Sequence, residues 1–561
     1  MDRETRRQIE EYRREQAGPL ENNLIDELVG GDLDRQEFLR RAAMFGVGAG
    51  TIGALLRFVG EADLALGAPA EVAQRGGTLR VGMLGFGGSA EPYKLAEGGS
   101  LGLVGIPGEY LTFSDPNLRI RPWLARSWRP NRDATVWTFQ LRRGVRFHNG
   151  QLMTADDVVA SFRQYVGNRQ SQALSVFEGV LGPEGVIKRG PYTVEFRLKA
   201  PTGVFPYLVS QTSYQTIIQP RAIARRPDTW VRSGMIGTGP FRLTRYVDKQ
   251  RAEFVRFPRY WGGPAPLDGV RLTFYQGSAP AVLALRAGQI DLAQQLSPQE
   301  AQPFRNNPRF RHFISATSAH REFCLRVDRE PFRDPRVRRA IALTMGRPEL
   351  IRRILLGTGT LGNDSPFWSK FPSTDPSIQQ RRQNVALARR LLEAAGVRNV
   401  DFTLSTHDYL DHPAHAASMQ AFARQAGIDI SLEVMSTTEY YAGGADYYAT
   451  TPWINRPSTL TEWGARGVPN QFIVAAFMSD GIWNAAHYRN AQFDSAARTY
   501  LAASDIRSQR AATKRMAGLL LRDTPVIINY FISYVTASSA RVRNYVPEGI
   551  SHVRLGRTSL A

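Results

Sequence analysis

The sequence contains a single cysteine, Cys324, in 561 residues. One thiol cannot form an internal disulfide, and it cannot build a multi-cysteine zinc or iron–sulfur site. Because no cysteine lies near the start of the chain, we also expect no lipoprotein anchor there. The length is enough for more than one domain, each with a hydrophobic core of its own.

The sequence also lacks the motifs by which common enzymes are recognised. It has no P-loop of the form G-x-x-x-x-G-K-[ST], no H-E-x-x-H and no G-x-S-x-G elbow. Residues 48–53 match the dinucleotide pattern G-x-G-x-x-G, but basic residues rather than a strand precede them, so we expect no dinucleotide there. Without an identifiable nucleophile–base pair, we predict that the protein is not an enzyme and holds no cofactor.

Lysine is scarce, with six residues in the whole chain, so arginine supplies nearly all of the net charge of +20. Residues 1–70 are slightly acidic, with 9 arginines against 13 acidic residues, so the positive excess lies in the remainder. The arginines occur as scattered pairs with acidic residues between them, and no lysine/arginine block or RNA-binding aromatic motif is present. We therefore predict a solvated basic surface and no nucleic-acid partner.

The apolar run that stands out in the sequence covers residues 42–56. About fifteen apolar residues cannot span a ~30 Å hydrocarbon core as one helix, but they suit the apolar region of a signal sequence. A basic flank precedes the run, and Ala68-Pro69-Ala70 is a candidate cleavage site of the small-x-small type. We therefore predict that residues 1–70 are an export signal with an N-terminal extension and that the protein is periplasmic.

The segment before this run resembles a twin-arginine export signal, whose pattern is Ser/Thr-Arg-Arg-x-Phe-Leu-Lys. Gln36 replaces the second arginine, and Asp34 replaces the leading Ser/Thr. This departure leaves three routes open, namely twin-arginine export, general secretion and an uncleaved anchor. The glycine content and the basic flank disfavour a buried core helix.

The rest of the chain alternates between strand and helix patterns. Residues 136–141 alternate apolar and polar side chains, as a half-buried strand does. Thr154 and Asp157 are spaced as a capping box that opens a helix, and Asp334-Pro335 places a cap and a first-turn proline at the start of another. An apolar strand is expected over residues 526–531. These patterns predict a large α/β protein.

Three histidines and two aspartates lie between His407 and His415. These residue types are metal ligands, and their crowding favours a metal site. However, Asp411 fits the N-cap of a helix and Pro413 fits its first turn, with an apolar face downstream. We therefore interpret the cluster as a helix start and predict no metal site.

Several short segments along the chain together resemble one family. They include RGGTLRVG at 75–82, the stretch 137–158, GTGPF at 237–241, YWGG at 260–263, LD at 267–268, GQID at 288–291, PFRDPRVRRAI at 331–341 and YRNAQFD at 488–494. They occur in order across nearly all of residues 75–561. In this respect the chain resembles the extracellular solute-binding proteins of family 5, the peptide/nickel-type receptors of ABC importers.

The resemblance implies an α/β, two-lobe periplasmic-binding-protein type II fold with an extra subdomain in lobe one. We expect lobe one over residues 71–315 with the subdomain at about 113–236, lobe two over 316–525, and a C-terminal return to lobe one over 526–561. The resemblance further implies a monomeric receptor that encloses a peptide-like or other small polar solute and delivers it to an ABC permease with its cytoplasmic ATPase. Two alternatives remain, a secreted hydrolase on the same scaffold and a binding or sensing protein that feeds no transporter.

Peptide-binding relatives hold the free α-amino group of a peptide with an aspartate shortly after a tryptophan in the second lobe. The corresponding loop here covers residues 462–469, and Arg466 stands where the acid is expected. A guanidinium repels an ammonium and binds carboxylate or phosphate in a bidentate fork. The resemblance therefore predicts that Arg466 binds an anionic or acceptor-rich group of the solute and that Trp463 supplies an apolar or stacking wall. Two alternatives stay open, a structural ion pair of Arg466 with Glu462, and an amine held by Glu462, which keeps ordinary peptides as ligands.

Overall fold

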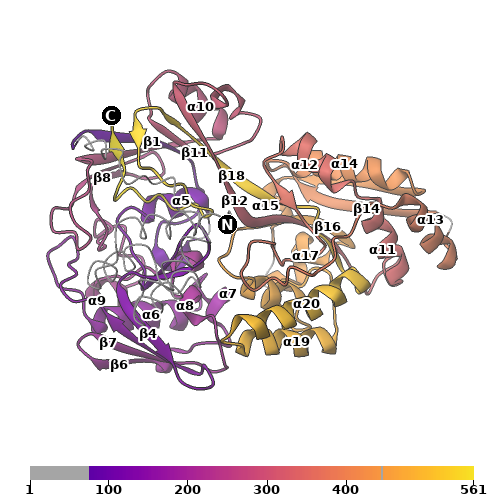
Figure 1. The fold of residues 1–561 in the computed structure, drawn as a ribbon, viewed down its shortest axis with the longest axis horizontal. Coiled ribbons are helices and arrows are strands. Elements are labelled where there is room, and N and C mark those ends of the chain that lie inside the picture. The colour runs from indigo at the N-terminus through magenta and orange to yellow at the C-terminus, as the bar shows by residue number, and fades with distance from the viewer. Residues whose placement is uncertain (1–74, 96, 398, 444–445) are drawn as a thin grey trace, which may run out of the picture. The chain divides into compact units, whose positions relative to one another are not determined.

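The computed structural model describes residues 75–95, 97–397, 399–443 and 446–561 (Figure 1). All of these residues belong to one compact unit, Gln74–Ala561. The predicted export signal over residues 1–70 and the glycine pattern at 48–53 lie outside the described residues. Within the described ranges, no helix is both long enough and apolar enough to cross a membrane.

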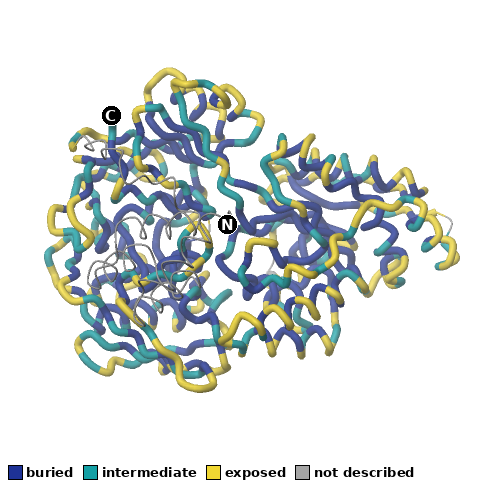
Figure 2. Tube along the Cα trace, in the orientation of Figure 1, coloured by how far each residue is buried: buried dark blue, intermediate teal, exposed yellow. Residues whose placement is uncertain are grey.

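In the described part of the chain, the largest sheet has 12 strands and continues through both lobes (Figure 1). Its order is β15 (Ile428–Met435), β14 (Val400–His407), β16 (Ser458–Trp463), β12 (Phe310–Leu325), β18 (Tyr530–Ser539), β11 (Leu292–Leu296), β1 (Thr78–Leu84), β10 (Gly269–Tyr275), β9 (Arg251–Arg256) and β8 (Phe241–Val247), with β13 (Thr360–Leu361) beside β18 and β17 (Val526–Ile527) beside β12. Figure 2 shows that the strands are largely buried, whereas the outer turns are exposed. The α/β class predicted from the sequence is confirmed.

Strands β12 and β18 connect the two lobes. Residues 310–316 of β12 pair with β18, whereas residues 320–325 pair with β16 of the second lobe. The register of β12 with β18 shifts between Ala316 and His320, and His320 pairs with Phe531 of β18 on one side and with Trp463 of β16 on the other. Such a shift interrupts the ladder and bends the strand locally, at the point where β16 joins β12.

In the first lobe, β1 lies between β10 and β11 and runs parallel to both. A second, antiparallel sheet belongs to an extra subdomain, and helix α6 packs on it. The elements of this lobe outside the large sheet are α5 (Gly98–Val104), β2 (Thr112–Ser114), β3 (Ile120–Pro122), β4 (Ala125–Pro130), β5 (Val136–Leu141), α6 (Ala155–Gly167), α7 (Leu174–Phe177), β6 (Val186–Gly190), β7 (Thr193–Arg197), α8 (Phe205–Leu208), α9 (Arg221–Ala224), α10 (Ser278–Arg286), β19 (Val542–Arg543) and β20 (Ser559–Leu560).

Two of the predicted local signals are confirmed in the subdomain. Strand β5 begins and ends as the alternating pattern predicts, with Trp137 and Phe139 buried in the core. Helix α6 begins after Thr154, and the backbone N–H of Thr154 donates to the Asp157 carboxylate over 2.8 Å, as a capping box requires. These signals act within a few residues, which is why the sequence shows them.

In the second lobe, β14 and β15 are parallel, and helices cover both faces of the sheet (Figure 1). The predicted cap at Asp334 is confirmed, because its carboxylate accepts from the backbone N–H of Arg336 over 2.7 Å. The helices are α11 (Pro335–Thr344), α12 (Arg347–Ile354), α13 (Val385–Ala394), α14 (His412–Arg424), α15 (Thr437–Tyr440), α16 (Tyr447–Thr450), α17 (Pro452–Asn455), α18 (Asn470–Phe472), α19 (Ala491–Ala502) and α20 (Ile506–Asp523).

The prediction of one continuous strand over residues 526–531 is wrong. The chain forms the short β17, leaves the ladder and enters β18 at Tyr530. The backbone N–H of Ile528 donates to the Asp364 carboxylate over 3.2 Å, and the carbonyl of Asn529 accepts from the N–H of Gly362 over 3.0 Å. A neighbouring loop therefore satisfies the backbone groups that a strand partner would otherwise satisfy.

Candidate functional site

The loop that follows β16 contacts both lobes. Tyr214 of the first lobe donates its hydroxyl to the carbonyl of Ala465 over 2.6 Å. Gln471 donates to the hydroxyl of Ser175 in the subdomain over 2.9 Å. The segment in which the sequence placed the ligand contacts therefore lies where the two lobes meet.

Arg466 is held at this junction by its backbone. Its N–H donates to the hydroxyl oxygen of Ser318 over 2.7 Å, and its carbonyl accepts from the same hydroxyl over 2.8 Å. Ser318 lies on β12 between Ala316 and His320, where the register of that strand with β18 shifts. The position of Arg466 is thus tied to the crossing strand.

The guanidinium of Arg466 has neutral neighbours. It lies 4.5 Å from the centre of the Tyr214 ring, donates through Nη1 to the carbonyl of Ala465 over 3.0 Å, and donates through Nε to Gln471. Among the residues that the structure describes, no ion pair joins Arg466 to Glu462, so this alternative is not what the geometry shows. A positive charge without an acid beside it suits an anionic ligand group.

Trp463 belongs mainly to the core of the second lobe. It is 6% exposed, and its ring lies against Phe472 and Trp483, with both centroid distances at 5.5 Å. It is also nearly parallel to His320 at 6.5 Å. The indole Nε1 is buried and has no hydrogen-bond partner among the described residues. That Trp463 forms a wall for the solute stays a prediction.

Glu462 faces the opposite way from Arg466, toward the carboxyl ends of the parallel strands. Its Oε2 atom lies 2.9 Å from Nε2 of His407 and 3.2 Å from Nε2 of His412, and it accepts from the hydroxyl of Tyr441 over 3.0 Å. Burial alone would raise the pKa of Glu462, but the two histidines outweigh it and hold this pKa well below its usual range. Glu462 is therefore an ionised carboxylate.

The helix start predicted within the histidine cluster is confirmed, because α14 begins at His412 with Pro413 in its first turn. The capping role predicted for Asp411 is wrong, because its side chain makes no capping bond. Its carboxylate instead pairs with Nη2 of Arg321 at 2.5 Å and accepts from the Tyr530 hydroxyl over 2.6 Å. Arg321 is 3% exposed, and a buried guanidinium needs a counter-charge more than a helix end needs a cap.

The three histidines of the cluster do not act together. His407 at the end of β14 and His412 at the start of α14 converge, with ring centroids 4.6 Å apart. His415, one turn further, packs instead on Tyr530 at 4.6 Å, and its Nε2 accepts from the side-chain amide N–H of Asn529 over 3.0 Å. Burial lowers the pKa of His415 to about 3, so it is a neutral core residue.

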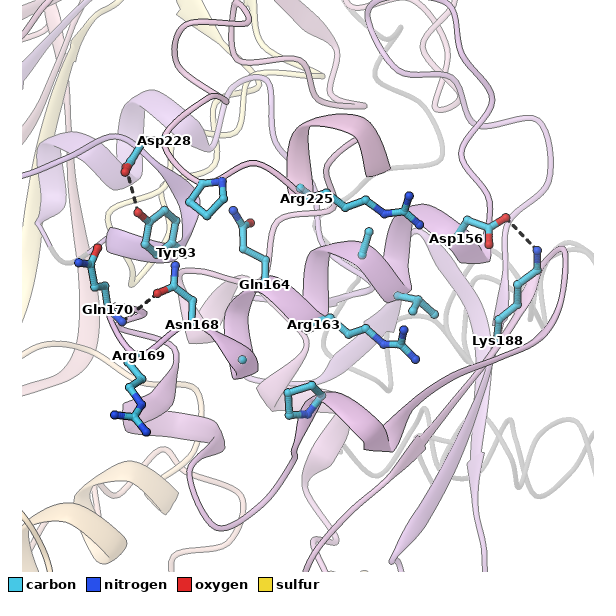
Figure 3. A pocket seen from close by; sticks show the side chains of 16 residues that line it. Tyr93, Asp156, Arg163, Gln164, Asn168, Arg169, Gln170, Lys188, Arg225 and Asp228 are labelled. Carbon is cyan, nitrogen blue, oxygen red and sulfur yellow. Dashed lines mark hydrogen bonds and ion pairs between the residues drawn. The ribbon is translucent and has the colours of Figure 1, made fainter.

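A groove with a volume of about 780 Å³ lies elsewhere, on the first lobe (Figure 3). Arg163, Arg225 and Lys188 line it, and Lys188 pairs with Asp156 at 2.8 Å. All of its lining residues lie between Tyr93 and Asp228, within the first lobe. Closure of the lobes would not enclose a solute there, so the groove does not replace the junction as the candidate site.

Several contacts at the junction could not be found from the sequence. Tyr214, Ser318 and Tyr441 belong to no motif, and each meets its partner across a long stretch of chain or a turn. The one related signal in the sequence is the histidine cluster. The sequence does not show that its members lie beside Glu462, because that depends on which strands are neighbours in the sheet.

Solved structures show the fold class. The chain is similar to the periplasmic binding protein DppA from Helicobacter pylori in complex with the peptide STSA, with a TM-score of 0.72, 22% identity, and coverage of 87% of this chain and 98% of that one. It is also similar to the substrate-binding protein CtaP from Listeria monocytogenes, with a TM-score of 0.74, 17% identity, and coverage of 87% and 99%. The protein therefore has the two-lobe, type II periplasmic-binding-protein fold.

The family is shown by the sequence. Residues 119–485 match the profile of the bacterial extracellular solute-binding proteins, family 5. This chain belongs to that family and is a solute-binding receptor of the kind that serves ABC importers. Known members are binding proteins rather than enzymes.

The names of the curated relatives refer to different solutes. The chain is 25% identical to the peptide transport periplasmic protein SapA of Salmonella typhimurium over 76% of this chain and 80% of that protein. It is 28% identical to the di/tripeptide-binding protein 2 of Pseudomonas aeruginosa, but over only 51% of this chain and 57% of that protein. It is 26% identical to the nickel-binding periplasmic protein of Escherichia coli over 58% and 65%.

Proposed function

We propose that the protein is exported to the periplasm, captures a peptide-like or anionic small solute between its lobes, and delivers it to an ABC permease with its cytoplasmic ATPase. The names of its relatives, which include peptide-binding and peptide-transport periplasmic proteins, support this class of solute and this location. The apolar run and the small-residue site before Glu71 support export.

The position of Arg466 is the observation that carries the proposal. Its backbone bonds to Ser318 on the crossing strand, and its guanidinium lies over Tyr214 of the first lobe. A solute that binds this guanidinium would therefore touch a group that both lobes position. Only a ligand with such differential contacts can stabilise the closed form relative to the open form.

We also propose the lobe boundaries that the family suggests. The first lobe would cover residues 71–315, the second 316–525, and the C-terminal return 526–561. Support comes from β12, which takes its second-lobe partner at His320, and from β18, which returns to the first lobe after Tyr530. The subdomain would occupy about residues 113–236.

The test begins with the solute itself. Native mass spectrometry of protein purified without added ligand should reveal a bound small molecule that denaturation releases. Calorimetry with that molecule should then give a one-to-one isotherm with no product, whereas turnover would favour a secreted hydrolase. Uptake of the solute that stays unchanged when the gene for this protein is deleted in its native host would favour a sensing role.

A further inference from the structure

Three side chains in the second lobe place their donor atoms close together. They are His407, His412 and Glu462, and one ligand atom of each lies within 4.8 Å of the others. His407 ends β14, His412 begins α14, and Glu462 lies near the end of β16, which runs parallel to β14. The two histidines are fully buried, and the Glu462 side chain is 28% exposed.

The hydrogen bonding of His412 leaves an unsatisfied atom. Its Nδ1 lies 2.8 Å from the carbonyl oxygen of Tyr409, which can only accept, so Nδ1 carries the proton. In the neutral ring Nε2 is then a bare acceptor, and it faces a second acceptor, Oε2 of Glu462, at 3.2 Å. This Nε2 is buried without a hydrogen-bond partner among the described residues.

Two acceptors in contact need a positive charge between them. One source is a second proton on His412, which would serve only the contact between His412 and Glu462. The other source is a metal cation, which all three donor atoms can meet at once. Asp411 already pairs with Arg321 at 2.5 Å, so the carboxylate of Glu462 is available to a cation.

The surroundings of His407 fit the same role. Its Nδ1 lies 3.0 Å from the hydroxyl of Thr437, so Nε2 is free to point toward Glu462. Its ring is parallel to those of Tyr409 and Tyr440, at 5.5 Å and 4.9 Å between centroids, which holds its orientation. Metal-ligating histidines typically donate the other ring N–H to a carbonyl or hydroxyl oxygen in this way.

The two separations from Glu462 fit a tetrahedral site. Zinc–nitrogen bonds of about 2.0–2.1 Å at the tetrahedral angle separate two ligand atoms by about 3.3 Å. The observed separations from Oε2 of Glu462 are 2.9 Å and 3.2 Å, and all three donor atoms lie within 4.8 Å of one another. Two histidines and one glutamate form a three-ligand set of the kind that leaves a fourth position for water or another ligand.

We propose that Nε2 of His407, Nε2 of His412 and the carboxylate of Glu462 bind one divalent first-row transition-metal ion such as zinc. This departs from the sequence-based prediction of no metal site and from the alternative in which Glu462 holds an amine. The reason is that a turn and two strands, rather than the spacing of the histidines, bring the three donors together. The site lies within the second lobe and does not depend on which solute the cleft takes.

The first experiment measures zinc alone. The purified full chain is stripped with a chelator, dialysed, and titrated with Zn²⁺ against a chromophoric chelator, with the bound metal counted by mass spectrometry. We expect one equivalent of zinc and a higher unfolding temperature when it is bound. A folded protein that binds no stoichiometric zinc would overturn the proposal.

Variants locate the site. His412→Ala and Glu462→Gln should each weaken zinc binding by at least about tenfold, since even changes in groups that support metal ligands have effects of this size. His487→Gln is the matched control, because His487 is partly exposed and lies 3.7 Å from Asp328, away from the three donors. Equal losses in the control, or unchanged affinity in both folded variants, would contradict the assignment.

A measurement on the parent decides the matter if the variants do not fold. Cobalt(II) is bound in place of zinc, and X-ray absorption counts the imidazole ligands. Two imidazoles with oxygen donors support the site, and any other ligand set overturns it.

Discussion

Glu462, near the end of β16, and Arg466, in the loop that follows it, lie four residues apart, yet they share no partner among the residues that the structure describes. Glu462 meets His407 at 2.9 Å inside the second lobe, whereas the guanidinium of Arg466 lies 4.5 Å from the Tyr214 ring of the first lobe. The negative and positive groups of this segment are thus separated rather than paired. Arg466 therefore has no acidic partner among the described residues, and this is the basis of the first prediction.

The first prediction concerns solute affinity. Arg466→Ala should weaken binding of the co-purified solute by about 10- to 100-fold, since a hydrogen bond to a charged group contributes about 1.5–3 kcal/mol. Arg466→Lys should recover only part of the loss, because an ammonium cannot form the bidentate fork. Calorimetry measures both.

Arg424→Ala is the control for this prediction. Arg424 is 62% exposed and only 3.8 Å from Asp429, so its removal should leave affinity unchanged. If Arg466→Ala binds the solute as tightly as the parent, Arg466 is not a ligand contact.

The second prediction concerns closure. Tyr214→Phe removes the hydroxyl that donates to Ala465 over 2.6 Å, and this bond connects the lobes. The closed form should lose about 0.5–1.5 kcal/mol relative to the open form. Small-angle scattering should show that the parent becomes more compact on ligand addition and that the variant needs more ligand for the same change.

Tyr207→Phe provides a matched comparison. Tyr207 also donates to a backbone carbonyl over 2.6 Å, but its partner, Leu118, is in the same lobe. This variant should close like the parent. A radius that stays constant with saturating ligand in the parent itself would contradict a hinge.

The third prediction concerns the buried pair beneath the histidine cluster. Asp411→Asn leaves Arg321 buried without a counter-charge, which should cost about 3–5 kcal/mol of stability at neutral pH. The urea midpoint followed by tryptophan fluorescence measures this loss. Asp429→Asn, at an exposed pair with Arg424, should change the midpoint little.

The same pair has a predictable pH dependence. Burial by itself would raise the pKa of Asp411, but Arg321 outweighs it and lowers this pKa below the unfolded value of about 3.9. A lowered folded pKa stabilises the protein above the unfolded pKa, and the contribution is lost as the pH falls toward the folded pKa. The difference in the free energy of unfolding between the parent and Asp411→Asn should therefore become smaller below about pH 4. A difference that stays constant with pH would contradict the ion pair.

The fourth prediction concerns export. N-terminal sequencing of protein from the periplasm should begin close to Glu71, because Ala68-Pro69-Ala70 has the form of a cleavage site. Charged residues placed in the apolar run 42–56 should stop export. Intact protein that stays in the cytoplasm of the native host would count against the signal.

The sequence predicted local structure, such as helix caps, correctly where its physical cause is local. The box of Thr154 with Asp157 and the cap at Asp334 depend on atoms within a few residues, so composition and spacing are sufficient. The family motifs similarly identified a two-lobe receptor over most of the chain. None of these inferences required knowledge of which strands are neighbours.

The sequence by itself determined the class of the protein, its alternating elements and the segment that carries Glu462 and Arg466. Only the tertiary structure decided what each charged group contacts. Asp411 does not cap the helix, because β12 brings Arg321, 90 residues away in the sequence, next to its carboxylate. Glu462 contacts His407 because β14 and β16 are neighbours in the sheet. A buried charge takes the partner that folding brings closest, and distance along the chain does not limit that choice.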